Sequence, residues 1–264
     1  MTILDKIFEA KRFRVDAAKQ AADIGQLKDS AQEVRSKSKP HYFRSALTDR
    51  GRVNIIAEFK RASPSKGLIN GVTEPADAAR RYQAAGARAM SVLTEEDFFQ
   101  GSLDDLKAAR AAISLPILRK DFMFDAFQIY EAAAAGSDAI LLIVSALSAD
   151  ELHQLLWIAE DKLSMDALVE VHTVEEMRTA NEIGANLIGV NNRNLKTFEV
   201  SLDVSRRLIE FASTSATLIS ESGVNSKDDI DQLSALGYSG FLIGETLMRS
   251  DDAEGSLREL IAAR

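Results

Sequence analysis

The feature that most constrains the fold of this chain is a strand–helix unit that recurs eight times. Each unit has a short run of β-branched or aliphatic residues, a few polar or glycine residues, and an alanine- and leucine-rich segment with helical spacing. The expected strands are Val53–Phe59, Ala89–Leu93, Leu115–Arg119, Ala139–Val144, Ala167–Val171, Leu187–Val190, Thr217–Ser220 and Gly240–Ile243. The helices are expected to begin near Pro75, Leu103, Asp125, Ala149, Val174, Leu202, Lys227 and Ala253.

Strands that alternate with helices pair in parallel through right-handed crossovers, and eight such units can close on themselves and leave no sheet edge. We therefore predict an α/β protein with a single (β/α)8 barrel, for which 264 residues is an ordinary length. An open doubly wound sheet is the alternative. Such sheets usually carry a G-x-G-x-x-G turn, and no such motif follows an expected strand.

The first 50 residues precede the first expected strand and predict an N-terminal helical extension. Helical patterns cover Ile3–Ala18 and Tyr42–Leu47, and a polar stretch that ends at Pro40 separates them. We therefore divide a single domain, residues 1–264, into an extension (1–50) and a barrel (51–264).

Charge and cysteine content exclude several classes of function. The net charge of −8 and a pI near 5.1 argue against a nucleic-acid surface, which needs a basic excess. The chain has no cysteine, so it forms no disulfide and no thiolate zinc site. Charged residues interrupt any signal-peptide core near the start, and no apolar run approaches the length of a membrane span. We expect a soluble cytoplasmic protein without nucleic-acid or membrane partners.

Metal sites are also not expected, because His41, His153 and His172 lack the spacing of metal ligands. A lone histidine of this kind is usually structural or solvated. The sequence predicts no metal and no cofactor.

Ionisable and polar residues end several of the expected strands. In a parallel barrel the chemistry lies at the carboxyl ends of the strands, so these residues are the candidates for a site. Taken singly, each is more simply a buried ion pair or a solvated strand end. Together they would be costly to bury without partners or a task, and a mixed group of acids and bases suits several proton transfers. The candidates are Glu58, Lys60, Lys120, Glu170, Asn191, Arg193, Glu221 and Ser222.

Glycine-containing turns after the last two strands predict a phosphate site. Gly223 and Gly244 follow the seventh and eighth strands, where barrels often bind phosphate through backbone N–H groups. Ser63 and Ser65, in the long non-helical connection Arg61–Glu74, offer hydroxyl donors. Each turn alone is a weak signal, since such tripeptides are often plain turns.

The segment Ile56–Ser65, with the sequence IAEFKRASPS, resembles the first-strand signature of the indole-3-glycerol phosphate synthase family. Further segments resemble the family in the same order along the chain, and so does the start, Ile3–Ile7. They are Ser91–Glu95, Phe99–Ser102, Leu118–Phe122, Leu168–His172, Ile188–Leu195, Ser220–Gly223 and Leu242–Gly244.

The resemblance implies a cofactor-free reaction of tryptophan biosynthesis. The substrate would be 1-(2-carboxyphenylamino)-1-deoxyribulose 5-phosphate, which is closed, decarboxylated and dehydrated to indole-3-glycerol phosphate. Lys120 would be the acid, with a pKa lowered by partial burial and by nearby Lys60. Glu170 would carry most of the other proton transfers, with help from Glu58 and Lys60, and Lys60 would also hold the anthranilate carboxylate.

The resemblance also assigns the binding residues. Asn191, Arg193, Glu221 and Ser222 would orient the substrate, and the benzene ring would lie in a slot formed by Phe99, Phe122, Leu141, Leu195 and Pro64. Ser63, Gly223 and Gly244 would contact the phosphate. Asn192 and Glu245 depart from the small residues of some members, and Glu245 should repel a phosphate unless it points away. Other enzymes of the tryptophan pathway are the candidate protein partners.

Two other functions remain open at this point. Another sugar-phosphate barrel, such as the isomerase of the preceding step, shares the fold and the phosphate site. We would expect that isomerase to carry a cysteine base, which this chain lacks. A barrel retained only as a binding or scaffold subunit would have no reason to keep Glu58, Lys60, Lys120 and Glu170.

Overall fold

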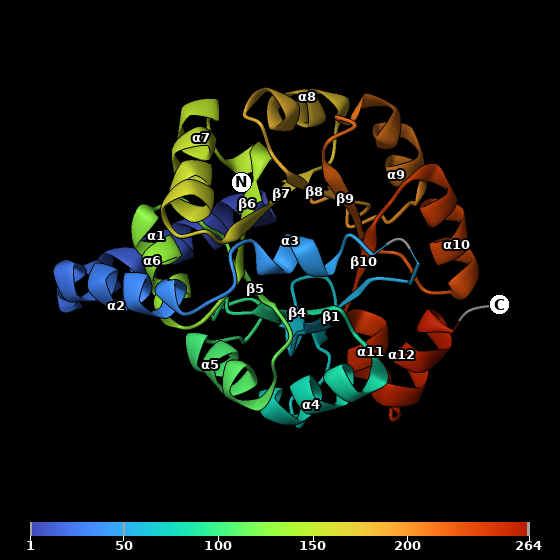
Figure 1. Cartoon of the computed structure of the whole chain (residues 1–264), viewed down its shortest axis with the longest axis horizontal. Helices are drawn as coiled ribbons and strands as arrows, with labels where there is room; N and C mark the ends of the chain where they lie inside the picture. Colours follow the sequence, from blue (N-terminus) through green and yellow to red (C-terminus); the bar gives the residue numbers. More distant parts are fainter. Residues whose placement is uncertain (1, 50, 263–264) are drawn as a thin grey trace.

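The computed structural model describes residues 2–49 and 51–262 and shows a closed barrel of eight parallel strands (Figure 1). Around the barrel the strand order is β1-β10-β9-β8-β7-β6-β5-β4. The predicted fold is confirmed, and the strand ends differ from the predicted ones by two residues or fewer. The strands are β1 (Ile55–Phe59), β4 (Ala89–Leu93), β5 (Ile117–Lys120), β6 (Ala139–Ile143), β7 (Asp166–Val171), β8 (Leu187–Asn191), β9 (Thr217–Glu221) and β10 (Gly240–Ile243).

The predicted helices surround the barrel. Several begin where a short polar side chain accepts a hydrogen bond from the first turn; examples are Ser102, Ser148 and Ser226. A short helix after β10, α11 (Glu245–Arg249), was not predicted, because five residues are too few to show a period. The others are α4 (Pro75–Ala85), α5 (Leu103–Ala112), α6 (Ala126–Ala134), α7 (Ala149–Trp157), α8 (Val174–Glu182), α9 (Asp203–Leu208), α10 (Lys227–Leu236) and α12 (Ala253–Ile261).

The long connection after β1 contains the hairpin of β2 (Ala62–Ser63) and β3 (Gly67–Leu68). The Phe99 carbonyl accepts a hydrogen bond from the Ala62 N–H at 3.2 Å. This bond joins the loop after β1 to the loop after β4, at the same end of the barrel.

Helix α3 (Tyr42–Ala46) closes the amino-terminal end of the barrel and crosses its centre in Figure 1. Phe43 and Leu47 are fully buried and pack with inward-facing residues of the strands, among them Ile56 and Leu118. The Arg44 N–H donates to the Asp166 carboxylate at 2.8 Å, at the start of β7. The interior is therefore a packed core at this end, and only the opposite end is open for a ligand.

The extension contains more helix than predicted. The polar stretch before Pro40 was taken as non-helical, and this was wrong: α1 (Ile3–Ala21) is followed by α2 (Ile24–Ser36). Ile24, Leu27, Ala31 and Val34 do recur at helical spacing, but they stand in a strongly polar segment, and only Ala31 and Arg35 of α2 are buried. Residues 1, 50, 263 and 264 lie outside the described part of the chain, so the division at residue 50 stays a prediction.

Arg35 fixes α2 to the barrel, and its loss should destabilise the protein. The buried guanidinium donates to the carbonyls of Leu163, Ser137 and Ser164 at 3.0–3.1 Å and lies 3.3 Å from Asp138. Arg35→Leu leaves these acceptors without a donor, so we expect the free energy of unfolding to fall by about 3 kcal/mol. Thermal unfolding followed by circular dichroism measures the change, which should lower the midpoint by roughly 6 to 12 °C.

The control for this variant is a matched substitution of the exposed Arg207 of α9, Arg207→Leu. We expect it to unfold close to the parent temperature. Equal midpoints for the two variants would contradict the anchoring role of Arg35.

Helix α1 lies over the open end of the barrel. Its buried Lys11 contacts Glu96 at 2.5 Å and Asp121 at 2.8 Å, and Arg14 pairs with Asp97 at 2.6 Å. These three carboxylates follow β4 and β5, so ion pairs fasten the helix to the loops at the carboxyl ends of the strands. Within residues 2–49 and 51–262, no helix is both long enough and apolar enough to cross a membrane.

Candidate active site

The side chains that face the barrel interior change from apolar to polar toward the carboxyl ends of the strands. Alternate residues of a strand share a face, so Ile56 of the packed interior places Glu58 on the same side. The other strands repeat the pattern with Leu118 and Lys120, Leu168 and Glu170, Gly189 and Asn191, and Ile219 and Glu221. The period of the strands therefore brings residues that are far apart in the sequence to one end of the barrel.

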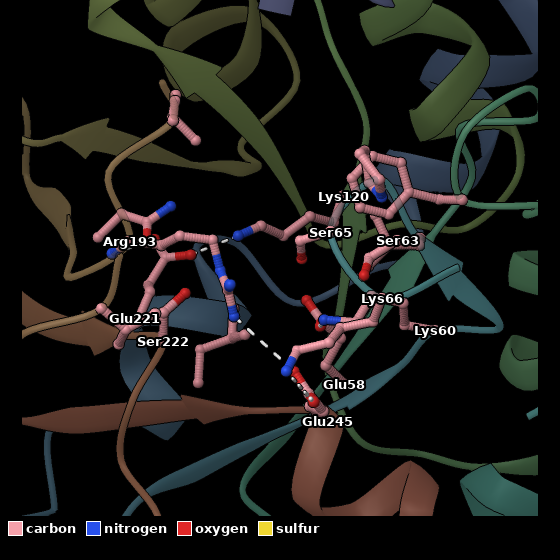
Figure 2. A pocket seen from close by; sticks show the side chains of 18 of the residues that line it. Glu58, Lys60, Ser63, Ser65, Lys66, Lys120, Arg193, Glu221, Ser222 and Glu245 are labelled. Carbon is pink, nitrogen blue, oxygen red and sulfur yellow. Dashed lines mark hydrogen bonds and ion pairs between the residues drawn. The ribbon is translucent and has the colours of Figure 1, made fainter. Parts of the chain in front are cut away.

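These residues surround a cavity of about 630 Å³ (Figure 2). Every side chain that we predicted to form the site lines it. They are Glu58, Lys60, Ser63, Pro64, Phe99, Lys120, Phe122, Leu141, Glu170, Asn191, Arg193, Leu195, Glu221, Ser222, Gly223 and Gly244. Their common location is an observation, and their individual roles stay predictions. The cavity wall also includes residues that we did not predict: Ile3, Leu4 and Ile7 of α1, Lys66 and Phe198 of the loops, and Arg249 of α11.

Lys120 lies at the centre of an ion cluster. Its Nζ donates to the Glu221 carboxylate and lies 3.4 Å from Glu170 Oε2. Burial alone would lower the pKa of Lys120, but the attraction of Glu221, Glu170 and Glu58 outweighs it and raises that pKa above its ordinary value. The prediction of a lowered pKa is therefore wrong for the ligand-free protein. Lys60, whose charge was expected to lower it, pairs instead with Glu58 at 2.6 Å.

The surroundings shift the pKa values of the two carboxylates beside Lys120 in opposite directions. Burial and the neighbouring carboxylates Glu170 and Glu58 raise the pKa of Glu221 to about 7, although Lys120 opposes this shift. Burial also favours the neutral form of Glu170, but Lys120 and His172 outweigh it and lower the pKa of Glu170. Near neutral pH Glu170 is therefore an anion, while Glu221 readily gains or loses a proton. Environments that separate two carboxylates in this way mark acid and base roles.

Two glycines make room for the carboxylates. A Cβ on Gly189 of β8 would overlap Glu221 Oε1, and a Cβ on Gly244 would overlap Glu58 Oε1. Gly189 therefore leaves the space that the Glu221 carboxylate fills. The sequence pattern singled out Asn191 of β8 but not Gly189.

An apolar slot lies beside the ion cluster. The rings of Phe99 and Phe122 are 5.8 Å apart at an interplanar angle of 37°, and Phe8 of α1 packs edge-on against Phe122 at 5.6 Å. The buried Glu95 carboxylate fixes the loop before Phe99, because it accepts the N–H groups of Phe98 and Phe99 at 2.7 and 2.9 Å. Such a slot suits a planar aromatic ring.

The loops after β9 and β10 form a polar rim on the other side of the cavity. Ser222 and Gly223 both have positive φ angles, 63° and 83°, so the chain turns sharply directly after Glu221. Thr246 Oγ1 donates to Asn225 Oδ1 at 3.2 Å and so links the two loops. Ser63 reaches the same cavity from the loop after β1.

Glu245 lies at this rim among three basic side chains. Its carboxylate is 3.7 Å from Lys66 Nζ, 3.8 Å from the Arg193 guanidinium and 3.2 Å from Arg249 Nε (Figure 2). Glu245 lines the cavity rather than pointing away from it. The surrounding cations offset its charge, and they are the groups that a bound anion would also contact.

Two further polar residues, one beside the cavity and one at the opposite end of the barrel, have structural partners. Asp121 is buried and accepts hydrogen bonds from Thr94 and Arg119 at 2.7 and 3.0 Å. His41 Nδ1 lies 3.1 Å from the Met165 carbonyl, at the closed end of the barrel. Within residues 2–49 and 51–262, no group of three or more histidine, aspartate or glutamate side chains is arranged to hold a metal ion.

The fold and the site define a (β/α)8-barrel protein in which a cluster of lysines and glutamates, an aromatic slot and a polar rim with basic side chains share one cavity. Solved structures of the same fold include thiamine phosphate pyrophosphorylase from Pyrococcus furiosus, with a TM-score of 0.59 and 17% identity over 80% of this chain and 95% of that one. A mandelate oxidase mutant matches with a TM-score of 0.60 and 15% identity, over 90% of this chain and 82% of that one. At such identities the likeness shows the fold alone.

Sequence comparisons identify the family. The family model for indole-3-glycerol phosphate synthase matches residues 4–260. The chain is 46% identical to indole-3-glycerol phosphate synthase of Carboxydothermus hydrogenoformans, over 98% of this chain and 99% of that protein. It is 44% identical to the synthase of Neisseria meningitidis serogroup B, over 98% of each. The chain belongs to the indole-3-glycerol phosphate synthase family, which confirms the resemblance.

Proposed function

We propose that this chain converts 1-(2-carboxyphenylamino)-1-deoxyribulose 5-phosphate to indole-3-glycerol phosphate, carbon dioxide and water. The observation that carries the proposal is the single cavity in which Lys120, Glu170 and Glu221 interact beside an apolar slot and a polar rim. An anthranilate ring fits the slot, a phosphate fits the rim, and the reacting carbons then lie between them, next to the acid–base cluster. Binding both ends of the substrate aligns the carbons that must form a bond.

Lys120 is the acid of the ring closure in this proposal. As a ring carbon attacks the ketone, the carbonyl oxygen becomes an alkoxide, which is far more basic than an amine. The carboxylates around Lys120 keep it protonated before the substrate arrives. Its raised pKa therefore secures the proton, and the basicity of the alkoxide drives its transfer.

Decarboxylation and dehydration complete the reaction. Once the new bond forms, the ring carries positive charge and accepts the electron pair released as carbon dioxide leaves, so the chemistry needs no metal or organic cofactor. Lys60, at the cavity wall, holds the carboxylate until it departs. In the dehydration Glu170 removes a proton from the substrate. Glu58 and Lys60 are the other groups of the cavity that can assist the departure of hydroxide.

The remaining cavity residues bind and orient the substrate. Asn191, Arg193, Glu221 and Ser222 contact its polar chain, while Phe99, Phe122, Leu141, Leu195 and Pro64 enclose the ring. Backbone groups at Gly223 and Gly244 and the Ser63 hydroxyl bind the phosphate.

Incubation of the purified protein with the anilino ribulose phosphate, followed by indole fluorescence, tests the proposal. We expect indole-3-glycerol phosphate to form at a rate that a chelator does not change. The isomerase of the preceding step would instead turn over the aminoaldose form of this sugar phosphate without any rise in indole fluorescence. A folded protein that binds the substrate and releases no indole product would be a binding subunit, and the proposal would fail.

Replacement of Glu245 should strengthen phosphate binding. In Glu245→Gln the negative charge among Lys66, Arg193 and Arg249 is removed, so these cations are free to attract a phosphate dianion. We expect the inhibition constant of inorganic phosphate, measured against the substrate, to fall about three- to tenfold, which corresponds to about 1 kcal/mol of Coulomb energy near a protein surface.

The control for this measurement is Glu254→Gln on α12, which removes an equal charge from an ion pair with Arg258. It should leave phosphate inhibition unchanged. Weaker inhibition in Glu245→Gln would show that Glu245 organises the basic side chains rather than competing for them.

We also propose a cytoplasmic location, in keeping with the absence of cysteine from the sequence. The sugar phosphate is the partner that the cavity supports. Other enzymes of the tryptophan pathway are the candidate protein partners, and cross-linking in cell extract followed by mass spectrometry tests whether they bind.

A further inference from the structure

His172 lies directly behind Glu170. It follows Glu170 by two residues at the end of β7, so the two side chains leave the chain on the same side. His172 Nε2 lies 3.6 Å from Glu170 Oε1, and His172 Nδ1 lies 3.3 Å from Oε2 of Glu176, on α8. The imidazole ring therefore bridges two carboxylates, one of which lines the cavity.

The environment of His172 differs from that of a solvated or purely packed histidine. Its side chain is 13% exposed, and its buried Nε2 has no hydrogen-bond partner within residues 2–49 and 51–262. Glu176 holds the ring from behind, because the same Oε2 also accepts the backbone N–H of His172 at 2.7 Å. The Glu176 N–H in turn donates to Thr173 Oγ1 at 3.2 Å, in the first turn of α8. The free ring nitrogen is thus fixed in place and faces Glu170.

We propose that His172 and Glu176 are positioning residues that keep Glu170 ionised and correctly oriented for proton transfer. This inference rests on the role of Glu170 in the proposed function. A proton on Nδ1 is shared with Glu176, so a second proton on Nε2 makes the ring a cation whose N–H faces Glu170 Oε1. A carboxylate that binds one ring nitrogen fixes the orientation of the ring and favours its protonated form.

The charges around the pair support this arrangement. His172 faces Glu170 on β7, Glu176 on α8 and Glu221 on β9. Burial lowers the pKa of His172, but the hydrogen bond to Glu176 and the attraction of Glu170 outweigh it and raise that pKa. The imidazolium is therefore favoured beside Glu170.

Glu170 has few other sources of positive charge. It faces Lys120 on β5, Asn191 on β8 and the imidazole of His172. Lys120 also pairs with Glu221, so its charge is shared between two carboxylates. The imidazolium of His172 is therefore the second cation, after Lys120, that offsets the cost of burying the Glu170 carboxylate.

The pH dependence of turnover tests the inference. In His172→Gln the pKa of Glu170 should rise, so Glu170 takes up a proton at a higher pH than in the parent. We expect kcat/KM to fall about tenfold on the acid side of its profile and to stay near the parent value on the alkaline side, because a charge within ~4–6 Å moves a pKa by about one unit or more. Glu176→Gln should cause a smaller change in the same direction. His153→Gln and Glu175→Gln, which replace exposed residues of the same types, should keep the parent profile.

A second measurement follows the protonation of Glu170 directly and does not depend on turnover. With ¹³C-labelled glutamate, the carboxyl signal that disappears in Glu170→Gln belongs to Glu170, and its titration is followed in each variant. We expect its midpoint to rise in His172→Gln and in Glu176→Gln. A midpoint equal to that of the parent in both variants overturns the inference. If Glu170→Gln retains full activity, the proposed role of Glu170 fails, while the titration still shows whether His172 controls its charge. If His172→Gln does not fold, the titration of Glu170 in Glu176→Gln tests the inference instead: a raised midpoint supports it, and a midpoint equal to that of the parent overturns it.

Discussion

Lys120→Met should lose most turnover while the protein still folds and binds phosphate. Methionine is close to lysine in length but donates no proton, and a positioned acid contributes roughly 10²- to 10⁴-fold to a rate. We therefore expect kcat to fall by about that factor, or about 3 to 5 kcal/mol of transition-state stabilisation. Stopped-flow or steady-state indole fluorescence measures the loss, and the inhibition constant of inorganic phosphate checks that the rim is intact.

The charge of Lys120 has a second effect that must be separated from proton donation. Lys120 lowers the pKa values of both Glu170 and Glu221, so its removal favours protonation of both carboxylates. If that were the whole effect, turnover of Lys120→Met would recover as the pH rises and Glu170 ionises again. We expect no such recovery. Lys120→Arg should also be slow, since a guanidinium keeps the charge but does not release its proton.

Two results would remove Lys120 from its role as the acid. One is normal turnover in Lys120→Met, and the other is full recovery at alkaline pH. The matched control is Lys107→Met, which replaces an exposed lysine of α5 and should have the kinetics of the parent protein.

Glu170→Gln should lose roughly 10²- to 10⁴-fold in kcat, with a small change in KM. The substitution preserves the shape of the side chain and removes its ability to accept a proton. Because Glu170 has a lowered pKa, the parent activity should depend on the ionised form and decline only as the solution becomes acidic. The variant should lack this acidic decline, since no carboxylate remains at this position to be protonated.

The control is Glu182→Gln, on the exposed side of α8. It should match the parent in rate and in pH profile. If Glu170→Gln turned over at the parent rate, the proton transfers would have to be reassigned to Glu221 or Glu58, the other carboxylates of the cavity.

Much of the fold was predictable because the same strand–helix unit recurs eight times along the sequence. A strand of five residues such as Ala89–Leu93 is weak evidence alone, yet eight such units admit few topologies. In a (β/α)8 barrel the carboxyl ends of the strands meet at one mouth, which is why Glu58, Lys120 and Glu170 are predicted to lie together. Helix α2 was missed because its apolar residues, although at helical spacing, stand in a strongly polar segment. The bonds of Arg35 to backbone carbonyls, which help to hold the helix, leave no pattern in the sequence.

The electrostatics of the site were not predictable from the strands one at a time. The sequence places Lys60 close to Lys120, but it does not show that Glu58 pairs with Lys60 while Glu221 turns toward Lys120. These pairings depend on contacts across the barrel and reverse the expected direction of the Lys120 pKa shift. The contact between His172 and Glu170 was not predictable for the same reason, because it depends on the rotamers of both side chains.

The hydrogen atoms of Gly189 and Gly244 stand where other residues carry a Cβ, and Glu221 and Glu58 fill that space. The residue at position 189 therefore limits the size of the side chain at position 221, and the residue at position 244 limits that at position 58. An alanine at Gly189 would overlap only the end of the Glu221 side chain, so a shorter side chain at position 221 should make room for it. An alanine at Gly244 would also overlap the Glu58 Cβ, so only a glycine at position 58 should relieve the overlap. Redesign of this barrel for another substrate must therefore change these positions as couples, and a search that varies one residue at a time would miss the workable combinations.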